Sequence, residues 1–286
     1  MIKITCTNRK GQSVVITEDR PYFLKSIEGL GDLEADNQLQ QAPYQDGSVY
    51  VDTLLNERVI HMSLIITVHT EKDLINHRQK LSSVFNPKLG ELEIKYEDGY
   101  QTKVIKGIPD SVPVFPSSDG DRMPTFQKAS ISITCPDPYW KDPQEVTRAL
   151  KAYDGKFTFP FEFPVEFGIE SDSTIIYNKG DTDAPITISI KGPIRRPIVE
   201  NVTTGEFIQL NTNINNDEIL WIDTSPRHKR VEIFHGNRII KAMGYLDHNS
   251  DFWQLVPGEN EIRYRADAGI AEAIASVSWK NQYVGI

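Results

Sequence analysis

Histidine and cysteine are the side chains most often used as metal ligands, bases and nucleophiles, and this chain carries few of them. It has six histidines and two cysteines. His69 and His77 are separated by a helix start expected at Thr70, so they do not share a helical face, while His61 and His69 fall on the polar side of a predicted strand. The metal-binding spacings C-x-x-C and H-E-x-x-H are absent. We therefore predict no bound metal and no cofactor.

Acidic residues are far more numerous, with 40 Asp and Glu in 286 residues. Asp119-Gly120-Asp121 and Asp181-Thr182-Asp183 each bring two carboxylates close together, but neither has the spaced ligands of an EF-hand calcium loop. A carboxylate pair for glycoside hydrolysis depends on the fold rather than on sequence spacing, so a hydrolase acting on cell-wall glycan stays open as the weakest alternative. Because the G-x-S-x-G and P-loop motifs are also absent, we predict a protein without catalytic residues, which is not an enzyme.

Tryptophan raises a different possibility, because an exposed indole offers a sugar ring a large apolar face. Trp253 is the candidate sugar-stacking residue, whereas Trp221 lies in an apolar run and is expected in a core strand. His235-Gly236-Asn237-Arg238 shares His and Asn with the galectin sugar-binding motif, but it lacks the proline and the spacing of that motif. A carbohydrate-binding module is therefore the alternative function.

Composition narrows the class of protein further. Hydrophobic residues make up 39% and charged residues 25% of the chain, as in proteins that bury a core, and the length suggests two domains. The net charge of −9 disfavours a surface that binds nucleic acid by neutralising phosphates. No apolar run reaches the roughly 20 residues that span a bilayer, and no secretory signal is visible, so we expect no membrane insertion. Cys6 and Cys135 are expected to be reduced thiols in an intracellular compartment.

The first half of the chain alternates apolar and polar residues with the period of two that is typical of strands. Four strands are predicted from this pattern, over residues 60–69, 92–96, 100–108 and 129–135. In the first of them one face is expected to be buried, and it carries Ile60, Met62, Leu64, Ile66 and Val68. Asp98-Gly99 favours a two-residue type I′ turn between the second and the third.

One helix is expected among these strands, over about residues 71–85. Thr70 can cap its start, and Pro87 and Gly90 follow its end. A single helix among many strands favours a mainly β fold, with an N-terminal β-sandwich against which the helix packs.

The domain boundary is expected after Pro136-Asp137-Pro138, where proline and charge replace the alternation. We assign residues 1–138 to the N-terminal domain, 139–156 to a junction and 157–286 to a second β domain. Its strands are indicated by alternation in residues 186–190, 231–241, 262–264 and 273–279. Short strands separated by turn residues favour a sandwich or jelly roll over a parallel sheet.

Two polar segments of the first domain show no periodicity of their own, Gly31–Gly47 and Ile108–Pro124. Unstructured loops longer than about 12–15 residues are usually functional or mobile. We expect both segments to contact neighbouring subunits or another component, if the chain is part of an assembly.

Four segments, in this order along the chain, resemble the distal tail protein (Dit) family of long-tailed, siphovirus-type bacteriophages and prophages. They are Asp46–Tyr50 with Glu57–Ile60, Cys135–Trp140, Phe252–Ile262 and Trp279–Ile286. Each motif is weak alone, but together their order and spacing span nearly the whole chain.

The resemblance implies a structural protein of the phage tail tip or baseplate, located in the virion and assembled in the bacterial host cytoplasm. It implies a ring, usually a hexamer, that connects the tail tube to the host-adsorption apparatus and docks receptor-binding or other tail-tip proteins. DNA would pass through the channel only as cargo, so we expect an acidic or neutral channel wall. The second domain would be a galectin-like jelly roll. In this setting, the alternative is a carbohydrate-binding module of a host-adhesion device.

Four residues are candidates for the domain junction or the assembly: Arg58, Pro138, Tyr139 and Trp140. Arg58 is expected either in an ion pair across a subunit boundary or in a surface ion pair at a strand start. Tyr139 and Trp140 are expected either to pack between the domains or to cap one sandwich.

Overall fold

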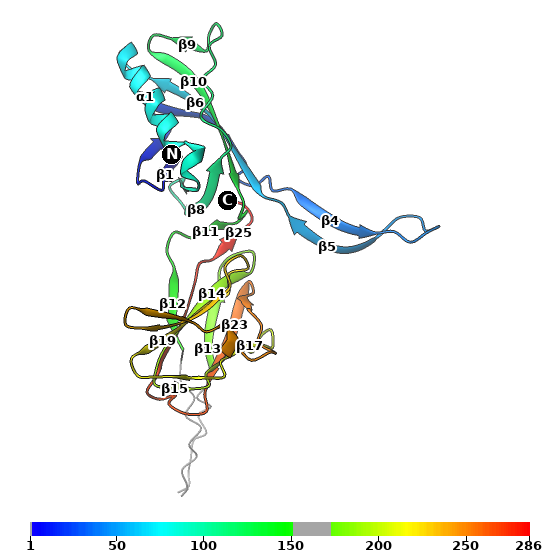
Figure 1. Ribbon diagram of the computed structural model, residues 1–286. Helices are drawn as coiled ribbons and strands as arrows, with labels where there is room; N and C mark the ends of the chain where they lie inside the picture. Colours follow the sequence, from blue (N-terminus) through cyan, green and yellow to red (C-terminus); the bar gives the residue numbers. More distant parts are fainter. Residues whose placement is uncertain (1, 151–172) are drawn as a thin grey trace, which may run out of the picture. The chain divides into compact units, whose positions relative to one another are not determined.

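The computed structural model describes residues 2–150 and 173–286, so the domain start that we predicted at residue 157 lies outside the described residues. The chain divides into two compact units, Met1–Pro143 with Tyr283–Ile286, and Gln144–Gln282 (Figure 1). The chain leaves the first unit after Pro143 and returns to it at Tyr283. Both units are rich in β-sheet, and α1 is the one α-helix among the described residues, which confirms the predicted mainly β fold.

The first unit is built on antiparallel strands in the order β2-β1-β7-β8-β10-β6-β3, and β9 pairs with β10 while β11 pairs with β8 and β25. Its elements are β1 (Lys3–Asn8), β2 (Ser13–Ile16), β3 (Tyr22–Glu28), β4 (Ala35–Gln40), β5 (Val49–Leu55), β6 (Arg58–Thr67), α1 (Glu71–Val84), η1 (Pro87–Leu89), β7 (Leu92–Glu97), β8 (Thr102–Pro109), β9 (Arg122–Met123), β10 (Phe126–Cys135), β11 (Trp140–Lys141) and β25 (Gln282–Tyr283).

The core of this unit follows the alternation of its strands. The five apolar residues predicted on one face of β6 are all buried, and Ile131 and Ile133 of β10 are buried beside them. Polar residues of the same strands consequently point to the opposite face of the sheet.

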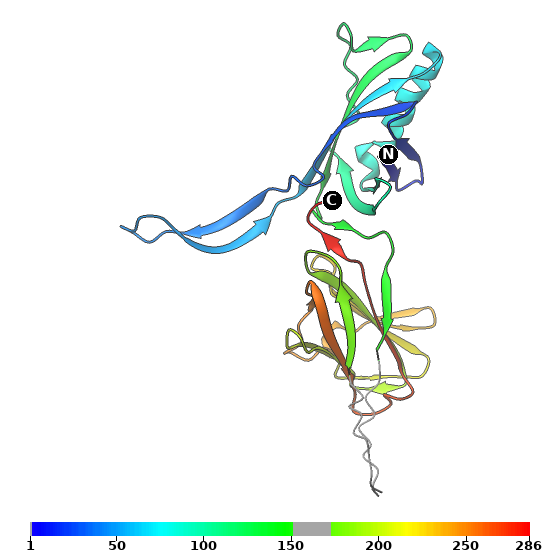
Figure 2. The same ribbon diagram turned by 180° about the vertical axis from the view of Figure 1, so that it is seen from behind.

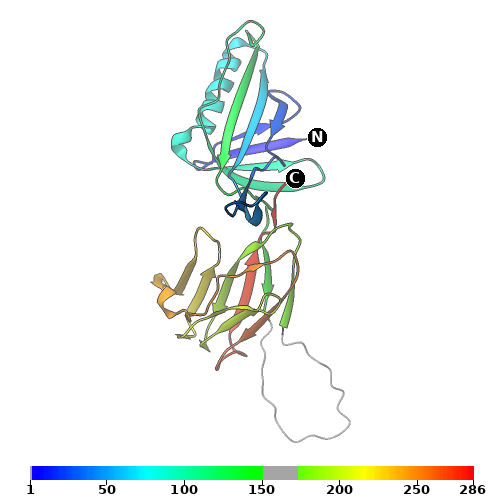
Figure 3. The same cartoon turned by 90° about the vertical axis from the view of Figure 1, so that its right-hand side faces the viewer.

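Helix α1 begins and ends where its sequence predicts. The Thr70 hydroxyl accepts a hydrogen bond from the amide of Asp73 at 3.1 Å, and the Phe85 amide donates to the Leu81 carbonyl at the other end. The apolar face buries Leu74 and Leu81 in the core. Figure 3 shows α1 lying alongside the long strands β6 and β10.

Three local predictions were wrong. The loop between β7 and β8 spans residues 98–101, because Glu97 pairs with Thr102 and the Asp98 carboxylate accepts hydrogen bonds from the next two amides, at Tyr100 and Gln101. The segment Gly31–Gly47 contains strand β4 and runs up to β5, and the segment 108–124 contains strand β9. Neither segment is a loop without structure of its own.

The second unit contains two larger antiparallel sheets, one ordered β12-β24-β14-β19-β20-β21 with β22 on β14, and one ordered β13-β23-β16-β17. Its elements are β12 (Val146–Ala149), β13 (Ser173–Asn178), β14 (Ala184–Lys191), β15 (Ile194–Arg195), β16 (Ile198–Asn201), β17 (Glu206–Gln209), β18 (Asn213–Ile214), β19 (Glu218–Asp223), β20 (Arg230–His235), β21 (Arg238–Lys241), η2 (Met243–Tyr245), β22 (Gln254–Leu255), β23 (Gly258–Arg265) and β24 (Ile274–Trp279).

A separate apolar core holds the second unit together. It includes Ile186, Ile188 and Ile190 of β14, as the alternation predicts. Trp221 departs from its prediction, because its neighbours Leu220 and Ile222 are buried while its own side chain lies on the other face of β19, with Arg230 4.9 Å from its ring.

Candidate functional site

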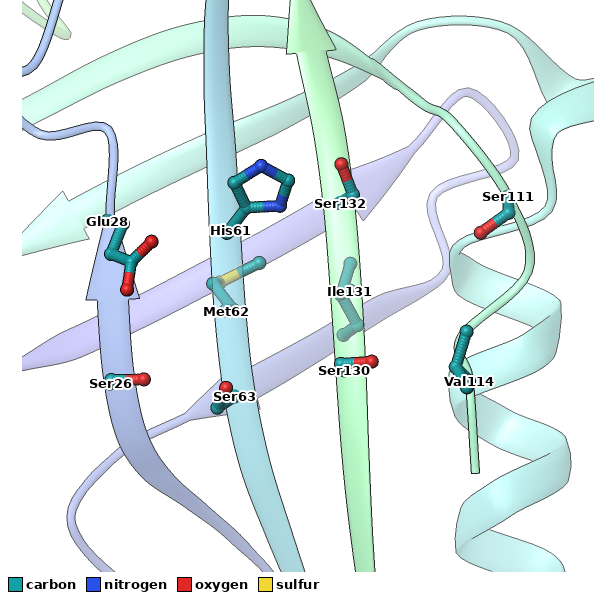
Figure 4. Close-up of a pocket in the computed structure, with 10 residues that line it drawn as sticks. All are labelled: Ser26, Glu28, His61, Met62, Ser63, Ser111, Val114, Ser130, Ile131 and Ser132. Carbon is teal, nitrogen blue, oxygen red and sulfur yellow. The ribbon is translucent and has the colours of Figure 1, made fainter. Parts of the chain in front are cut away.

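A polar surface covers the face of β3, β6 and β10 that is turned away from the core. We call it the hydroxyl face, and Figure 4 shows it. A shallow cavity of about 280 Å³ lies on it, lined by Ser26, Glu28, His61, Met62, Ser63, Ser111, Val114, Ser130, Ile131 and Ser132. Ser26, Ser63, Ser130 and Ser132 come from three adjacent strands whose intervening residues are apolar, so this surface follows largely from strand alternation, and Ser111 joins it from the segment after β8.

One row across the hydroxyl face has the residue types of a catalytic triad. His61 is the register partner of Ser132 on one side and of Glu28 on the other, and Figure 4 shows it between them. The Ser132 hydroxyl, however, donates a short hydrogen bond to the carboxylate of Asp110, so its proton is held by a carboxylate rather than by the imidazole. Among the described residues, no hydrogen bond joins His61 to either neighbour. The row therefore lacks the nucleophile–base contact on which acyl transfer depends.

The charge of this surface is low. Its lining contains one carboxylate, Glu28, and no lysine or arginine. The neighbouring Asp110 accepts hydrogen bonds from Ser132 and from Thr134, and Lys128 on β10 pairs with Asp121 at 2.8 Å. The lining offers no cation to phosphates and the nearby Lys128 is already paired, so this surface attracts a polyanion only weakly.

A second unusual feature is a two-stranded hairpin, β4 and β5 with the connecting residues 41–48, which we call the arm. Figures 1 and 2 show it extending away from the sheet of the first unit, seen from opposite sides. Leu39 faces Tyr50 across the ribbon beside the pair Asn37 and Thr53, and Leu39 is 60% exposed. Other exposed apolar residues of the arm are Tyr44, Val49, Val51 and Leu54.

Arg58 differs from both of its predictions. Its side chain is 1% exposed and donates hydrogen bonds to three backbone carbonyls, those of Gly29 at 2.7 Å, Pro138 at 2.8 Å and Val284. Within residues 2–150 and 173–286, no carboxylate lies within ion-pair distance of it. Burial lowers the pKa of this guanidinium, while Cys135 and the nearby Asp32 act in the opposite direction. It is neither a surface ion pair nor an exposed group available to another subunit.

The other junction candidates lie in the first unit. Trp140 is fully buried in its core, with the Tyr96 ring 6.3 Å away, and Tyr139 is partly exposed. This placement agrees with the alternative in which the pair covers one sandwich. Pro138 contributes its carbonyl to Arg58.

Trp253 cannot stack on a sugar as placed here. Its side chain is 1% exposed and belongs to the core of the second unit. The residue type alone suggests sugar stacking for Trp253, but burying the apolar indole stabilises the protein more than leaving it exposed. The alternative carbohydrate-binding function therefore loses the residue on which it depended.

Burial raises the pKa of both thiols, Cys6 and Cys135, to about 12. In the described part of the chain, no three His, Cys, Asp or Glu side chains converge as metal ligands. No helix there is long and apolar enough to span a membrane.

Sequence reasoning missed the arm, and a signal for it was present. Val49-Tyr50-Val51 is a run of β-branched and aromatic residues, and Asp46-Gly47 precedes it as a turn dipeptide, so together they indicate a hairpin. Polar Gln and Asp residues in the first strand obscured the alternation. By contrast, the contacts of residues 283–286 have no local signal.

Comparison with known proteins agrees with this architecture. The phage tail protein RIFT-related domain model matches residues 9–135, and the model of the siphovirus-type tail component, C-terminal domain, matches residues 179–283. No curated protein sequence is significantly similar to the chain.

Two solved structures share the fold over almost the full chain. One is the Dit protein of phage SPP1, described as a paradigm of the hub adsorption apparatus in phages that infect Gram-positive bacteria. It has 16% identity, a TM-score of 0.69 and 98% coverage of both chains. The other is a chain of the phage P2 baseplate in its activated conformation with Ca, with 12% identity, a TM-score of 0.52 and 100% coverage of both chains.

The two family models match separate stretches of the chain, 9–135 in the first unit and 179–283 almost entirely in the second. Both describe components of phage tails. The chain belongs to the siphovirus-type Dit family, and it is a non-enzymatic structural component of the phage tail.

Proposed function

We propose that six copies of this chain close into a ring that connects the tail tube to the host-adsorption apparatus. The observation that carries this proposal is the arm, because a two-stranded hairpin alone is at best marginally stable in water. Its exposed apolar residues find no cover within the described chain. A neighbouring copy supplies that cover if each subunit places its arm on the next, and a repeated contact of this kind closes into a ring.

The register of the arm suggests which side meets the neighbour. Leu39 and Tyr50 are directly opposed on one side. The other side carries Asp36 and Gln38, which are joined by a 2.8 Å hydrogen bond, and it carries Asp52 opposite Gln38. The side of Leu39 and Tyr50 can be buried without desolvating a charge, so we assign it to the inter-subunit contact.

In this ring the hydroxyl face lines the channel, through which DNA passes as cargo. Small hydroxyls and the carboxylates of Glu28 and Asp110 give DNA no cation to bind. In this proposal, these residues form the acidic or neutral channel wall that the resemblance implies. A solved ring with a strongly basic lumen would contradict it.

The partners of the ring follow from the same role. We assign the tube-side contacts to the first unit, together with segment 108–124. The second unit is assigned to docking receptor-binding or other tail-tip proteins. In this proposal the ring is assembled in the host cytoplasm before it becomes part of the virion.

Native mass spectrometry of the purified protein tests the ring. The expected species has six times the 32.5 kDa of one chain, and negative-stain images should show rings. Leu39→Asp should leave a folded single chain, because it places a charge in the proposed contact. Ile239→Asp is the matched control, since Ile239 in the second unit is also 60% exposed, and it should assemble normally.

Two outcomes would contradict the proposal. One is a chain that stays single at every concentration, with and without its tail neighbours. The other is a ring that forms equally well with Leu39→Asp and with Ile239→Asp, because the arm would then not be part of the contact.

A further inference from the structure

Both ends of the arm meet at one buried side chain. The chain enters the arm after Gly29 and leaves it just before Arg58, the first residue of β6. The Arg58 guanidinium donates to the Gly29 carbonyl at 2.7 Å, so it joins the entry of the arm to the exit. Gly29 has a φ of +87°, and a Cβ at this position would lie 2.1 Å from the Val59 carbonyl oxygen. The root of the arm is thus tightly packed and needs glycine at this position.

Residues 283–286, which we call the return segment, complete this root. The Val284 carbonyl accepts from Arg58, and the Ile286 amide donates to the Leu30 carbonyl at 3.3 Å. The return segment therefore touches the arm's entry directly as well as through Arg58.

A second set of contacts fixes the return segment to the first unit. The Lys103 ammonium lies 3.3 Å from the centroid of the Tyr283 ring and pairs with Asp142 at 2.7 Å. The Tyr283 hydroxyl donates to the same carboxylate at 3.3 Å. Lys103 is largely buried, so this cation–π contact and ion pair are weakly screened by water.

The charged Arg58 guanidinium depends on the return segment for one of its hydrogen-bond acceptors. Its hydrogen-bond partners are backbone carbonyls from three distant segments, and the charged fork is almost completely buried. A buried guanidinium that loses an acceptor leaves an unpaired donor in a region of low dielectric. Removing Val284 would therefore loosen the hold of Arg58 on the other two carbonyls as well.

We propose that Arg58 is a positioning residue for the arm, and that the return segment is the part that locks it. Arg58, Gly29 and Val284 fix the direction in which the arm leaves the first unit, so that the arm is preset for its neighbour. This inference rests on the proposed function, in which the arm contacts another copy. A preset arm lowers the ordering cost of each contact in the ring.

The direction of the arm can be measured without assembly. Spin labels attached through Tyr44→Cys at the arm tip and Lys88→Cys on the body of the first unit give a distance distribution by pulsed electron resonance. Both sites are exposed, whereas the native Cys6 and Cys135 are buried thiols that the label cannot reach. Diluting labelled with unlabelled protein isolates the distance within one chain.

Three variants of the full chain are compared with the parent. Arg58→Lys keeps the charge but loses the three-way fork. Deletion of residues 283–286 removes the acceptor at Val284. Arg238→Lys, at an exposed arginine of the second unit, is the matched control. We expect a narrow distance distribution in the parent and the control. In the first two variants it should be at least about twofold broader, because the arm then samples several directions relative to the first unit.

Each outcome decides the inference. Broadening in Arg58→Lys and in the deletion, with the near-UV circular dichroism of a folded core, supports it. An unchanged width in either folded variant overturns it. If a variant fails to fold, Arg58→Gln replaces it, since it removes the three-way fork without leaving a buried charge; an unchanged width there also overturns the inference.

The failure of this inference is distinct from failure of the proposed function. If Arg58 fixes the arm but Leu39→Asp still forms rings, the assigned ring contact is wrong and the positioning role of Arg58 is supported. If Leu39→Asp abolishes the ring but the two variants leave the distance distribution unchanged, the ring contact is supported and the positioning role of Arg58 is wrong.

Discussion

Two segments of the first unit, Gly31–Gly47 and 108–124, have similar lengths and similarly polar sequences, yet they take opposite courses. The first becomes the outer part of the arm, with its apolar side chains exposed. The second folds back over the sheet and ends in strand β9, which pairs with β10. Sequence polarity alone does not separate them.

The contacts of segment 108–124 explain its course. Val114 exchanges two backbone hydrogen bonds with Ser130, at 2.9 and 3.0 Å. The buried Gln127 side-chain amide donates to the carbonyl of Pro116 at 2.7 Å, and Phe115 packs against the core with Arg78 4.7 Å from its ring. These contacts hold the segment against the sheet, although Val112, Val114 and Met123 stay exposed.

The two segments differ in where their side chains find packing partners. Both segments expose apolar residues, but 108–124 is also tied to the sheet through Val114 and partly buries Phe115. Across the residues that the structure describes, the arm has no such contacts with the body of the unit, so we assign it to the proposed assembly and 108–124 to the fold of the unit. The four predictions below test this distinction.

Proteolysis of the unassembled protein should show the largest difference. We expect proteinase K to cut after Tyr44 at least about a hundredfold faster than after Val114, because cleavage follows the population of locally open chain and opening of the arm costs little. Mass spectrometry of the fragments over time gives both rates. Assembly should slow the cut at Tyr44 and leave the other unchanged, and equal rates at the two sites would contradict the comparison.

Gln127→Leu should lower the free energy of unfolding by about 2–3 kcal/mol. Gln127 is 1% exposed, and the substitution leaves the carbonyls of Pro116, Asp121 and Lys128 without their side-chain donor. Urea unfolding of the unassembled protein measures the loss. Gln41→Leu is the control, because Gln41 makes one exposed hydrogen bond on the arm, and its effect should stay below about 0.5 kcal/mol.

Phe115→Ala should cost about 2 kcal/mol, less than a fully buried phenylalanine, since its ring is only partly covered by the core. Tyr50→Ala on the arm should cost less than about 0.5 kcal/mol in the unassembled protein. The same unfolding measurement compares them. Similar losses for both would mean that the arm is packed in the isolated chain.

Arg78→Met should have the smallest effect, about 0.5–1 kcal/mol, because it removes one cation–π contact to Phe115 while keeping an apolar stem. Thermal unfolding of the single variant and of the double variant with Phe115→Ala isolates the pair. Strictly additive losses would show that the two side chains do not interact.

The cores of both units were predictable because burial follows a local period of two. Ile60, Met62 and Leu64 show it in the first unit, and Ile186–Ile190 show it in the second. The register between distant strands is not local. The alternation marked Ser63 and Ser130 as polar but could not show that they are opposed on one surface.

Arg58 shows the same limit more sharply. Its position at a strand start suggested a surface, since an isolated arginine is rarely buried. Its actual partners are the backbone carbonyls of residues 29, 138 and 284. Every residue type carries a backbone carbonyl, so the sequence does not indicate which ones will accept. Only the folded chain brings these three positions together.

The return of the chain to its first unit sets an order of events during synthesis. Residues 283–286 are made after the whole of Gln144–Gln282, so a nascent chain that has finished residue 143 still lacks the acceptor for Arg58. The ribosome must deliver the second unit before the arm root is complete, so in the proposed ring the arm is ready for a neighbour only after that unit has been made. For the same reason, a fragment ending at Pro143 is an incomplete module, and a dissected version must carry residues 283–286 grafted back.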